Sequence, residues 1–159
     1  MKKQKWIWEY EEYPNFKYDK DRLSLILRDI AYEQGKLKAF MLLMDQDNYV
    51  DILIDANTNY KEALNLEKIF GWHHAMFEKG YSGFSKIKVA EFRGDGSMQV
   101  VSGDYGKEKI HYEAPPFDTL EQEMNSFIQW FNETPSSLEK AAIMHLWFVI
   151  IHPFDDGNG

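Results

Sequence analysis

The sequence predicts one mainly helical domain that carries a small β-excursion near its middle. Apolar residues recur at helical spacing along most of the chain, and short β-like runs gather between residues 83 and 116. No internal repeat or low-complexity linker divides the 159 residues, a length that can bury a core without disulfides or metals. We expect an N-terminal extension and helix at 1–48, followed by a core unit at 49–159.

The composition excludes several classes of function. The chain has 18 Lys and Arg residues against 26 Asp and Glu, and its net charge of −8 disfavours nucleic acid or an anionic membrane surface as a partner. With no cysteine, it has no disulfide framework and no Cys nucleophile. The apolar stretch 141–151 is about half of the roughly 20 residues that a membrane-spanning helix requires. We therefore expect a cytoplasmic protein with no membrane partner.

The N-terminal region combines an aromatic arm with a helix. The first 18 residues are rich in Trp, Tyr and Phe, and Pro14-Asn15 marks a turn within them, so we expect an extended arm packed on the core. Asp19 is placed to cap a helix whose apolar residues recur at i, i+3, i+4 and i+7. This helix is predicted to extend toward Leu43.

Two further helices are predicted in the first half of the core unit. Apolar residues at helical spacing indicate one helix over 49–57. The next helix begins with Asn65 as its N-cap and ends at Gly80. His73-His74 lie on it without a carboxylate at metal-ligand spacing, so we expect them to be structural.

The segment from Gly83 to Pro116 is predicted to form a β-hairpin or flap. Three short runs have β-like composition, and glycine-containing turns separate them. The predicted runs are 87–93, 99–101 and 109–112, with turns at 94–96 and 103–106. His111 lies on this presumed flap.

Helical spacing resumes after the flap and continues almost to the last residue. The segment 119–122 has the form of a capping box, in which a Thr side chain and an acidic or amide side chain cap each other's main chain. Residues 136–139 open the last helix in the same way. His145 falls on the buried stripe of that helix, and we expect it to be a hydrogen-bonded core histidine.

The junction after the last helix is the most informative part of the sequence: His152-Pro153-Phe154-Asp155-Asp156-Gly157-Asn158-Gly159. Because proline biases the preceding residue away from helical angles, the helix should end at or just before His152 and leave its imidazole at the helix mouth. Phe154 can anchor the turn. The sequence Gly157-Asn158-Gly159 can turn successive N–H groups toward one point, as an anion-binding nest does.

Two acids beside an anion nest indicate a divalent cation, because a carboxylate next to a phosphate is otherwise repulsive. Asp155 or Asp156 therefore suggests Mg²⁺ shared with a phosphate. His152 then fits the role of a base. The same residues also fit a polar turn in which His152 only caps the helix, and spacing alone leaves both interpretations open.

The segment 152–159 resembles the first eight positions of the Fic motif, His-Pro-Phe-x-(Asp/Glu)-Gly-Asn-Gly-Arg-x-x-Arg, of the Fic family of protein adenylyltransferases. The resemblance extends to the preceding helix at 140–151 and to the flap at 83–116. The residues Trp6-Ile7-Trp8 with Pro14-Asn15-Phe16 resemble the Trp-rich N-terminal extension of bacterial members. The resemblance implies a Fic-type helical bundle with a β-hairpin flap and an active-site loop after the last helix.

The resemblance also implies a reaction and a role for each motif residue. His152 would be the general base that takes a proton from a Ser, Thr or Tyr hydroxyl of a target protein, which then attacks the α-phosphorus of ATP and expels pyrophosphate. Asp156 would hold Mg²⁺ against the phosphates. An anion hole would be formed by Gly157, Asn158 and Gly159. Structural support would come from Pro153 and Phe154.

The partners implied by the resemblance are ATP and a protein substrate that docks on the flap by strand addition, and a homodimer is suggested as well. Two alternatives stay open. One is a Fic enzyme that uses another nucleotide donor, and the other is a catalytically incomplete Fic-like domain that regulates or binds a partner.

Two departures from the family pattern lead to further expectations. The motif continues in the family with Arg-x-x-Arg, whereas this sequence stops at Gly159, and we expect a fragment of a longer protein. Between Leu43 and Tyr49 relatives carry a longer stretch with an inhibitory motif. We expect that a segment is missing near residues 44–49.

Overall fold

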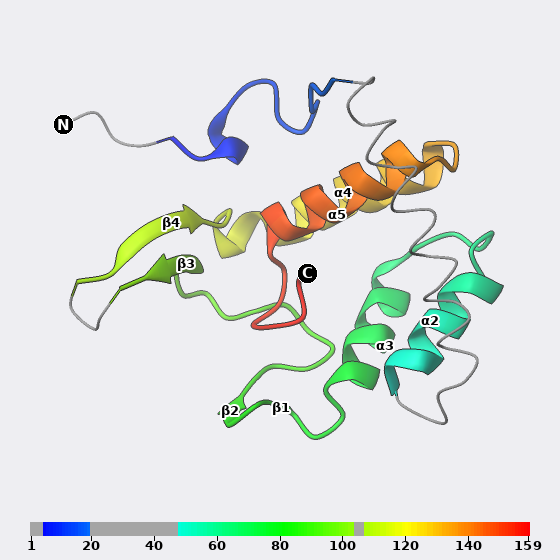
Figure 1. Ribbon diagram of the computed structural model, residues 1–159, viewed down its shortest axis with the longest axis horizontal. Coiled ribbons are helices and arrows are strands. Elements are labelled where there is room, and N and C mark those ends of the chain that lie inside the picture. Colours follow the sequence, from blue (N-terminus) through cyan, green and yellow to red (C-terminus); the bar gives the residue numbers. More distant parts are fainter. Residues whose placement is uncertain (1–4, 20–47, 104–106) are drawn as a thin grey trace.

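The computed structural model describes residues 5–19, 48–103 and 107–159, and most of this part is helical, as predicted (Figure 1). The helix expected after Asp19 lies outside the described residues, and so do residues 44–47 of the place near 44–49 where a missing segment is expected. Two packed helix pairs and two small antiparallel hairpins make up this described part of the chain. Its four α-helices are α2 (Asn48–Thr58), α3 (Leu66–Met76), α4 (Leu120–Glu133) and α5 (Leu138–Ile151).

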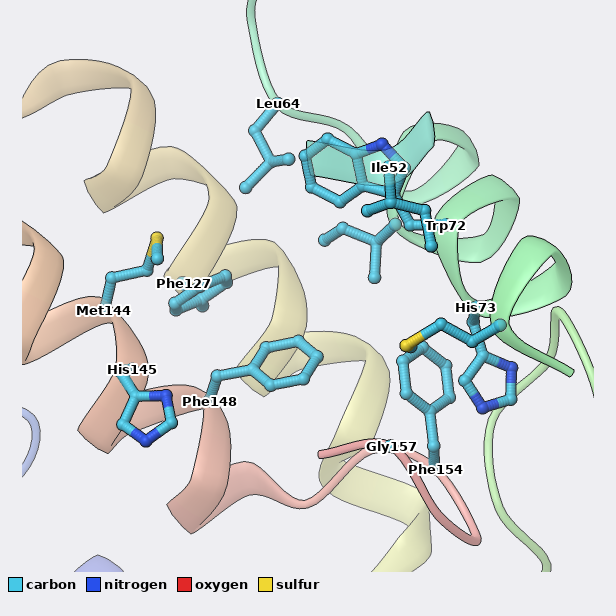
Figure 2. Close-up of a pocket in the computed structure, with 12 residues that line it drawn as sticks. Ile52, Leu64, Trp72, His73, Phe127, Met144, His145, Phe148, Phe154 and Gly157 are labelled. Carbon is cyan, nitrogen blue, oxygen red and sulfur yellow. The ribbon is translucent and has the colours of Figure 1, made fainter. Parts of the chain in front are cut away.

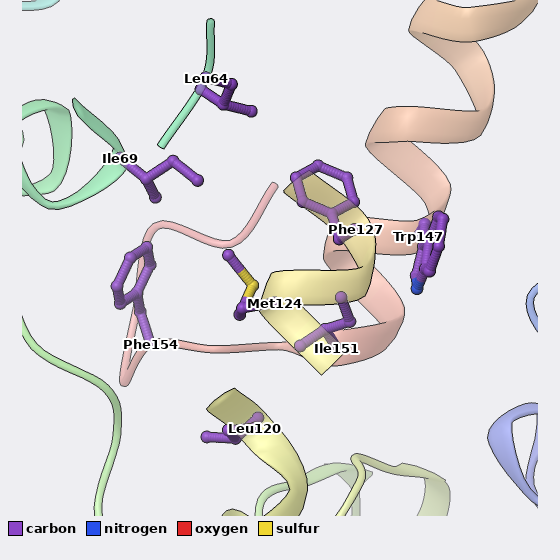
Figure 3. Close-up of a cluster of buried hydrophobic side chains, with 8 residues drawn as sticks. All are labelled: Leu64, Ile69, Leu120, Met124, Phe127, Trp147, Ile151 and Phe154. Atoms are coloured by element: carbon purple, nitrogen blue, oxygen red, sulfur yellow. The ribbon is translucent and has the colours of Figure 1, made fainter. Parts of the chain in front are cut away.

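The core lies where α4 and α5 pack on each other and against α3. Leu120, Met124 and Phe127 recur on one face of α4, and each is at most 2% exposed. They meet Trp147 and Ile151 of α5, as Figure 3 shows. Burying side chains of this size stabilises the fold by about 1.5–3 kcal/mol each. The C-terminal end of α5, which leads into the predicted site, is therefore anchored in the best-packed part of the molecule.

The helix starts follow the predicted cap in one case and depart from the predictions in two. Asn65 caps α3 by accepting a hydrogen bond from the N–H of Lys68 at 2.8 Å. The capping-box form of 136–139 makes Ser136 the cap of α5, whereas the structure has Ser137 in that place, accepting from the N–H of Lys140. The capping box expected at 119–122 does not form, because a 3₁₀ turn, η2 (Phe117–Thr119), runs directly into α4 and the Thr119 hydroxyl donates to the oxygen of Pro116 instead.

Two hairpins form the β-part of the fold. The shorter one joins β1 (Tyr81–Ser82) to β2 (Ser85–Lys86), and the longer one joins β3 (Gln99–Ser102) to β4 (Lys109–Glu113). The β3–β4 pair is antiparallel, with an irregularity in register between Val100 and Val101. In Figure 1 this hairpin extends away from the helices, and we call it the flap. The predicted strands at 99–101 and 109–112 are confirmed.

The predicted β-run at 87–93 is not a strand. Ala90 has a left-handed backbone (φ 57°), which a strand does not accommodate. The main-chain N–H groups of this segment are used elsewhere: Ala90 donates to His73, and Arg93 donates to the oxygen of Pro153 at 2.8 Å. The segment therefore connects α3 to the loop after α5 rather than forming a hairpin around residues 94–96.

The aromatic arm packs on the core, as its composition predicted. It contains a short 3₁₀ turn, η1 (Ile7–Glu9), and the indole N–H of Trp8 donates to the oxygen of Glu113 at the end of β4. Further along, the indole N–H of Trp147 donates to the Tyr13 hydroxyl at 2.7 Å, and this hydroxyl donates to Glu123 at 3.0 Å. Burial raises the pKa of Tyr13, which stays a neutral donor.

None of the helices in the described ranges combines the length and the apolar character that crossing a membrane requires.

Candidate active site

The predicted base lies at the end of α5. The helix ends at Ile151, and His152 adopts a left-handed conformation (φ 52°, ψ 59°) before Pro153, so the predicted helix end is confirmed. Its main-chain N–H donates to the oxygen of Phe148 at 3.0 Å. The ring atom Nδ1 lies 3.3 Å from the oxygen of Val149, which requires a proton on Nδ1. Nε2 then carries the lone pair that a base needs.

The surroundings of His152 keep its imidazole neutral. Burial lowers the pKa of His152 below the ordinary value of 6.5, and the positive charge of Arg93 lowers it further. The hydrogen bond to Val149 and the charge of Asp156 act in the opposite direction without reversing the shift. Near pH 7 the ring can therefore accept a proton.

The side chain of Asn158 closes the loop that follows α5. It is 6% exposed, its Oδ1 accepts from the N–H of Phe154, and its Nδ2 donates to the oxygen of Phe154, both at 2.9 Å. Because both ends of the amide are used within the loop, a phosphate role for Asn158 falls to its main-chain N–H group. The predicted structural role of Phe154, which is 2% exposed, agrees with this closed loop.

His73 of α3 holds the same loop from the opposite side. Its ring stacks on Phe154 with centroids 4.0 Å apart, as Figure 2 shows. Nδ1 accepts from the N–H of Ala90, and Nε2 lies 3.1 Å from the oxygen of Asp156, to which it donates. The residue is fully buried, and burial lowers its pKa. A structural role was predicted for His73. Its contact with this loop could not be predicted, because the loop lies at least 79 residues further along the chain and a single sequence does not indicate such long-range contacts.

Gly157 provides the turn that the nest requires. Its φ is +80°, and a Cβ there would lie 2.8 Å from the ring of Phe77. The N–H of Gly157 donates to Oδ1 of Asp156 at 2.7 Å. Within the described residues the N–H groups of Asn158 and Gly159 have no hydrogen-bond acceptor. Two adjacent main-chain N–H groups without acceptors can donate hydrogen bonds to a phosphate oxygen.

The two acids of the loop have different surroundings. Asp155 accepts from the main-chain N–H of Lys88 at 2.9 Å and so ties the loop to the segment before the flap. Asp156 is exposed and accepts hydrogen bonds from the Ser82 hydroxyl and from Gly157, which lower its pKa. An ionised, accessible carboxylate is a suitable oxygen ligand for Mg²⁺. No group of three protein ligands occurs in the described part of the chain.

Arg93 is a site residue that the sequence analysis missed. It is 1% exposed, and its Nε donates to the oxygen of His152 at 2.8 Å. Its Nη2 donates to the oxygen of Pro115, which follows β4. The sequence placed Arg93 at the end of a predicted strand, where an arginine is normally solvated.

A cavity of about 240 Å³ lies beside Gly157, between α3 and the α4–α5 pair (Figure 2). Its lining is mostly apolar and includes Phe127, Met144 and Phe148. His145 lies at this cavity and is exposed. The expectation that His145 is a core histidine is therefore wrong, because its side chain lies at the open cavity and not in the packed core.

The remaining histidines agree with their predicted places. His74 is exposed on α3, next to the buried His73. His111 lies on β4 of the flap, and its Nε2 is 2.6 Å from the hydroxyl of Ser102 on β3.

The fold and the loop together define a class of mainly helical proteins in which a neutral histidine at a helix end leads into a loop with free main-chain N–H groups. Residues 63–159 match the Fic/DOC family, and residues 6–71 match a family described as Domain of unknown function (DUF4172). The first match spans more than half of the chain, and the protein therefore belongs to the Fic/DOC family. Members of this family are typically transferases.

One similar solved structure is the crystal structure of a Fic family protein from Desulfovibrio desulfuricans G20. The two chains are 22% identical and superpose with a TM-score of 0.47 over 72% of the present chain. The present chain covers 34% of that protein, and so spans about a third of its length.

Proposed function

We propose that this protein transfers AMP from ATP to a Ser, Thr or Tyr hydroxyl of a target protein, with His152 as the general base. The observation that carries the proposal is a neutral imidazole, protonated on Nδ1, at the start of a loop in which the N–H groups of Asn158 and Gly159 have no acceptor within the described residues. The target oxygen bonds to the α-phosphorus, the bond from that phosphorus to the pyrophosphate oxygen breaks, and the hydroxyl proton moves to Nε2 of His152.

The loop supplies the phosphate-binding groups of this proposal. The N–H groups of Asn158 and Gly159 would stabilise the charge that builds up on phosphate oxygens during transfer. The closed loop keeps them in place, since Asn158 and His73 fix it from two sides. Preorganised donors do not have to reorient at the moment of reaction.

Mg²⁺ belongs to the proposal as the cation that offsets phosphate charge. Asp156 would hold it through the accessible carboxylate that Ser82 and Gly157 keep ionised. When bound, the ion would supply charge neutralisation at the phosphates of ATP. Asp155 is the weaker candidate, because it occupies the variable position of the motif and is less exposed than Asp156.

The flap is proposed to align the target segment. Within the described residues β3 and β4 pair with no other strand, and the aromatic arm contacts β4 at its end through the bond from Trp8 to Glu113, so we expect β3 to offer the edge for another strand. Val100, Val101 and Ile110 on the hairpin are between 41% and 47% exposed. Strand addition at such an edge binds a target mainly through its main chain.

The test is transfer of label from ATP labelled at the α-phosphate, with Mg²⁺, to protein in a lysate. We expect labelled protein bands with the unmodified chain and at least about a 100-fold lower rate with His152→Ala. His74→Ala is the matched control, because it removes an exposed imidazole that has no contact with the loop. ATP labelled at the γ-phosphate should give no labelled bands beyond those that the kinases of the lysate produce without this protein.

Two outcomes would overturn the proposal. Equal labelling by the His152→Ala variant would remove His152 from the reaction. Labelling from a different nucleotide, with none from ATP, would instead support a Fic enzyme with another donor.

A further inference from the structure

The end of α5 is capped by residues from outside the helix. The last carbonyl groups of a helix have no partner within it, and a buried helix end needs donors from elsewhere. The Tyr112 hydroxyl donates to the oxygen of Ile150 at 2.6 Å, and Arg93 donates from Nε to the oxygen of His152. The main-chain N–H of Arg93 also donates to the oxygen of Pro153. The predicted base thus lies beside main-chain oxygens that accept hydrogen bonds from Arg93, which precedes β3, and from Tyr112, which lies on β4.

Arg93 is the most constrained of these donors. Its guanidinium is buried, and its hydrogen bonds go to the carbonyl oxygens of His152 and Pro115. A buried positive charge is stabilised here because the negative end of the α5 dipole lies at the same place. The guanidinium fork spans two fixed carbonyls, one at the loop and one at the end of β4.

The backbone of His152 needs such support. A residue with a side chain adopts φ 52° only where its surroundings impose it. Bonds from Arg93 to the oxygens of His152 and Pro153 fix the two peptide groups that follow the His152 Cα atom. The direction in which the imidazole leaves the helix depends on these peptide groups.

We propose that Arg93 is a positioning residue for His152: its guanidinium holds the left-handed backbone of His152 and ties it to Pro115 at the base of the flap. The catalytic part of this inference rests on the proposed function, while the structural part stands on the hydrogen bonds alone. A flap that binds a target would, through Arg93, be rigidly connected to the base that deprotonates it.

Arg93→Lys and Arg93→Gln test the proposal in the full chain. Lysine keeps the charge but cannot bridge two carbonyl oxygens with a planar fork, and glutamine lacks both the charge and the fork. If the guanidinium geometry positions His152, neither variant should hold the His152 ring in place. The readout is the ring nitrogen signals of His152, assigned by their absence in His152→Ala and measured with ¹⁵N-labelled histidine. We expect the Nδ1-protonated form in the unmodified chain and a mixture of both ring forms in the two variants.

Transfer kinetics give a second readout. For both variants we expect kcat to fall roughly 10-fold to 100-fold while KM for ATP changes less than about threefold, because only the base is displaced. Asn132→Ala is the control for general destabilisation. It removes two hydrogen bonds to Leu64, away from the loop, and should leave both the ring signals and kcat unchanged.

A measurement on the unmodified chain covers the case in which the variants do not fold. The Nε proton of Arg93 should exchange with water at least about 100-fold more slowly than that of free arginine, since it is buried and bonded to His152. Fast exchange, or unchanged His152 ring signals in Arg93→Lys, would overturn the proposal. If the unmodified chain transfers no label, the proposed function fails, and the ring signals still decide the role of Arg93.

Discussion

The imidazole of His73 donates from Nε2 to the main-chain oxygen of Asp156, 83 residues later in the chain, at 3.1 Å. On its other side, Nδ1 accepts from the N–H of Ala90. Both bonds exist together only when the ring is neutral, because a protonated Nδ1 would face the Ala90 N–H as a second donor. One uncharged side chain therefore joins α3, the segment before the flap and the loop after α5.

The first prediction follows from this requirement and concerns stability in acid. Burial lowers the pKa of His73 and of His152 in the folded protein below the ordinary 6.5. A histidine with a lowered folded-state pKa stabilises the fold above pH 6.5, and this stabilisation is lost as pH falls below 6.5 toward the folded-state pKa. We expect the free energy of unfolding to be flat between pH 8 and 7 and to decrease below 6.5, by up to about 1.4 kcal/mol per pH unit for each histidine.

Urea unfolding at a series of pH values measures this dependence. His73→Gln should reduce the slope below pH 6.5, because one of the two titrating rings is gone. His74→Gln, which removes the exposed neighbour, should leave the slope unchanged. A curve that is equally steep in His73→Gln and in the unmodified protein would refute the assignment to His73.

The second prediction concerns the pH dependence of transfer and rests on the proposed function. The base must be neutral, and burial and Arg93 hold the pKa of His152 below 6.5. The value of kcat/KM should therefore stay constant from pH 8 down to 6.5 and decrease only at lower pH. In Arg93→Gln the midpoint should move to higher pH, since a positive charge that opposed protonation has been removed.

Steady-state label transfer between pH 5 and 8 provides the profile. A midpoint above 6.5 in the unmodified protein would contradict the neutral base that burial implies.

The third prediction concerns Gly157. In Gly157→Ala the new Cβ would lie 2.8 Å from Cε2 of Phe77, in a backbone with φ +80° that disfavours any side chain. The left-handed conformation alone costs about 1–2 kcal/mol, and the displaced Phe77 ring adds to it. We expect a loss of at least about 2 kcal/mol in unfolding free energy, together with weaker ATP binding, because the nest that follows is reshaped.

Gly96→Ala is the matched control for this substitution. A Cβ at Gly96 has no atom within 4 Å, so the same chemical change should alter stability by less than about 0.5 kcal/mol. If both variants lose the same amount in urea unfolding, the contact with Phe77 is not the cause.

The sequence predicts the local features of this protein and leaves out its long-range connections. The cap Asn65 and the helix end before Pro153 were predictable, and the start of α5 was predictable to within one residue, because each depends on neighbouring residues alone. The motif residues 152–159 were recognisable because they follow one another without interruption. The family match at 63–159 bears out the membership that these residues indicated.

The contacts that hold the loop in place were not predictable from one sequence. Arg93 and His73 act on residues that are 59 and 83 positions away, and nothing in their neighbours indicates those partners. The strand predicted at 87–93 was wrong for the same reason. Its β-like composition is local, whereas the bonds to His73 and Pro153 that bend it come from the folded core.

The fourth prediction separates two roles for the Asn158 side chain. Its amide makes a pair of bonds to the main chain of Phe154, and it is buried. Asn158→Ala leaves the N–H and the oxygen of Phe154 without partners, which should cost about 2–4 kcal/mol of unfolding free energy.

Asn132→Ala is a close match, because Asn132 makes the same pair of bonds to the main chain of Leu64. Both variants should lose similar stability, and only Asn158→Ala should also lose ATP binding in calorimetry. An Asn158→Ala protein with full stability and weakened ATP binding would instead show that the amide contacts the nucleotide directly and does not act by closing the loop.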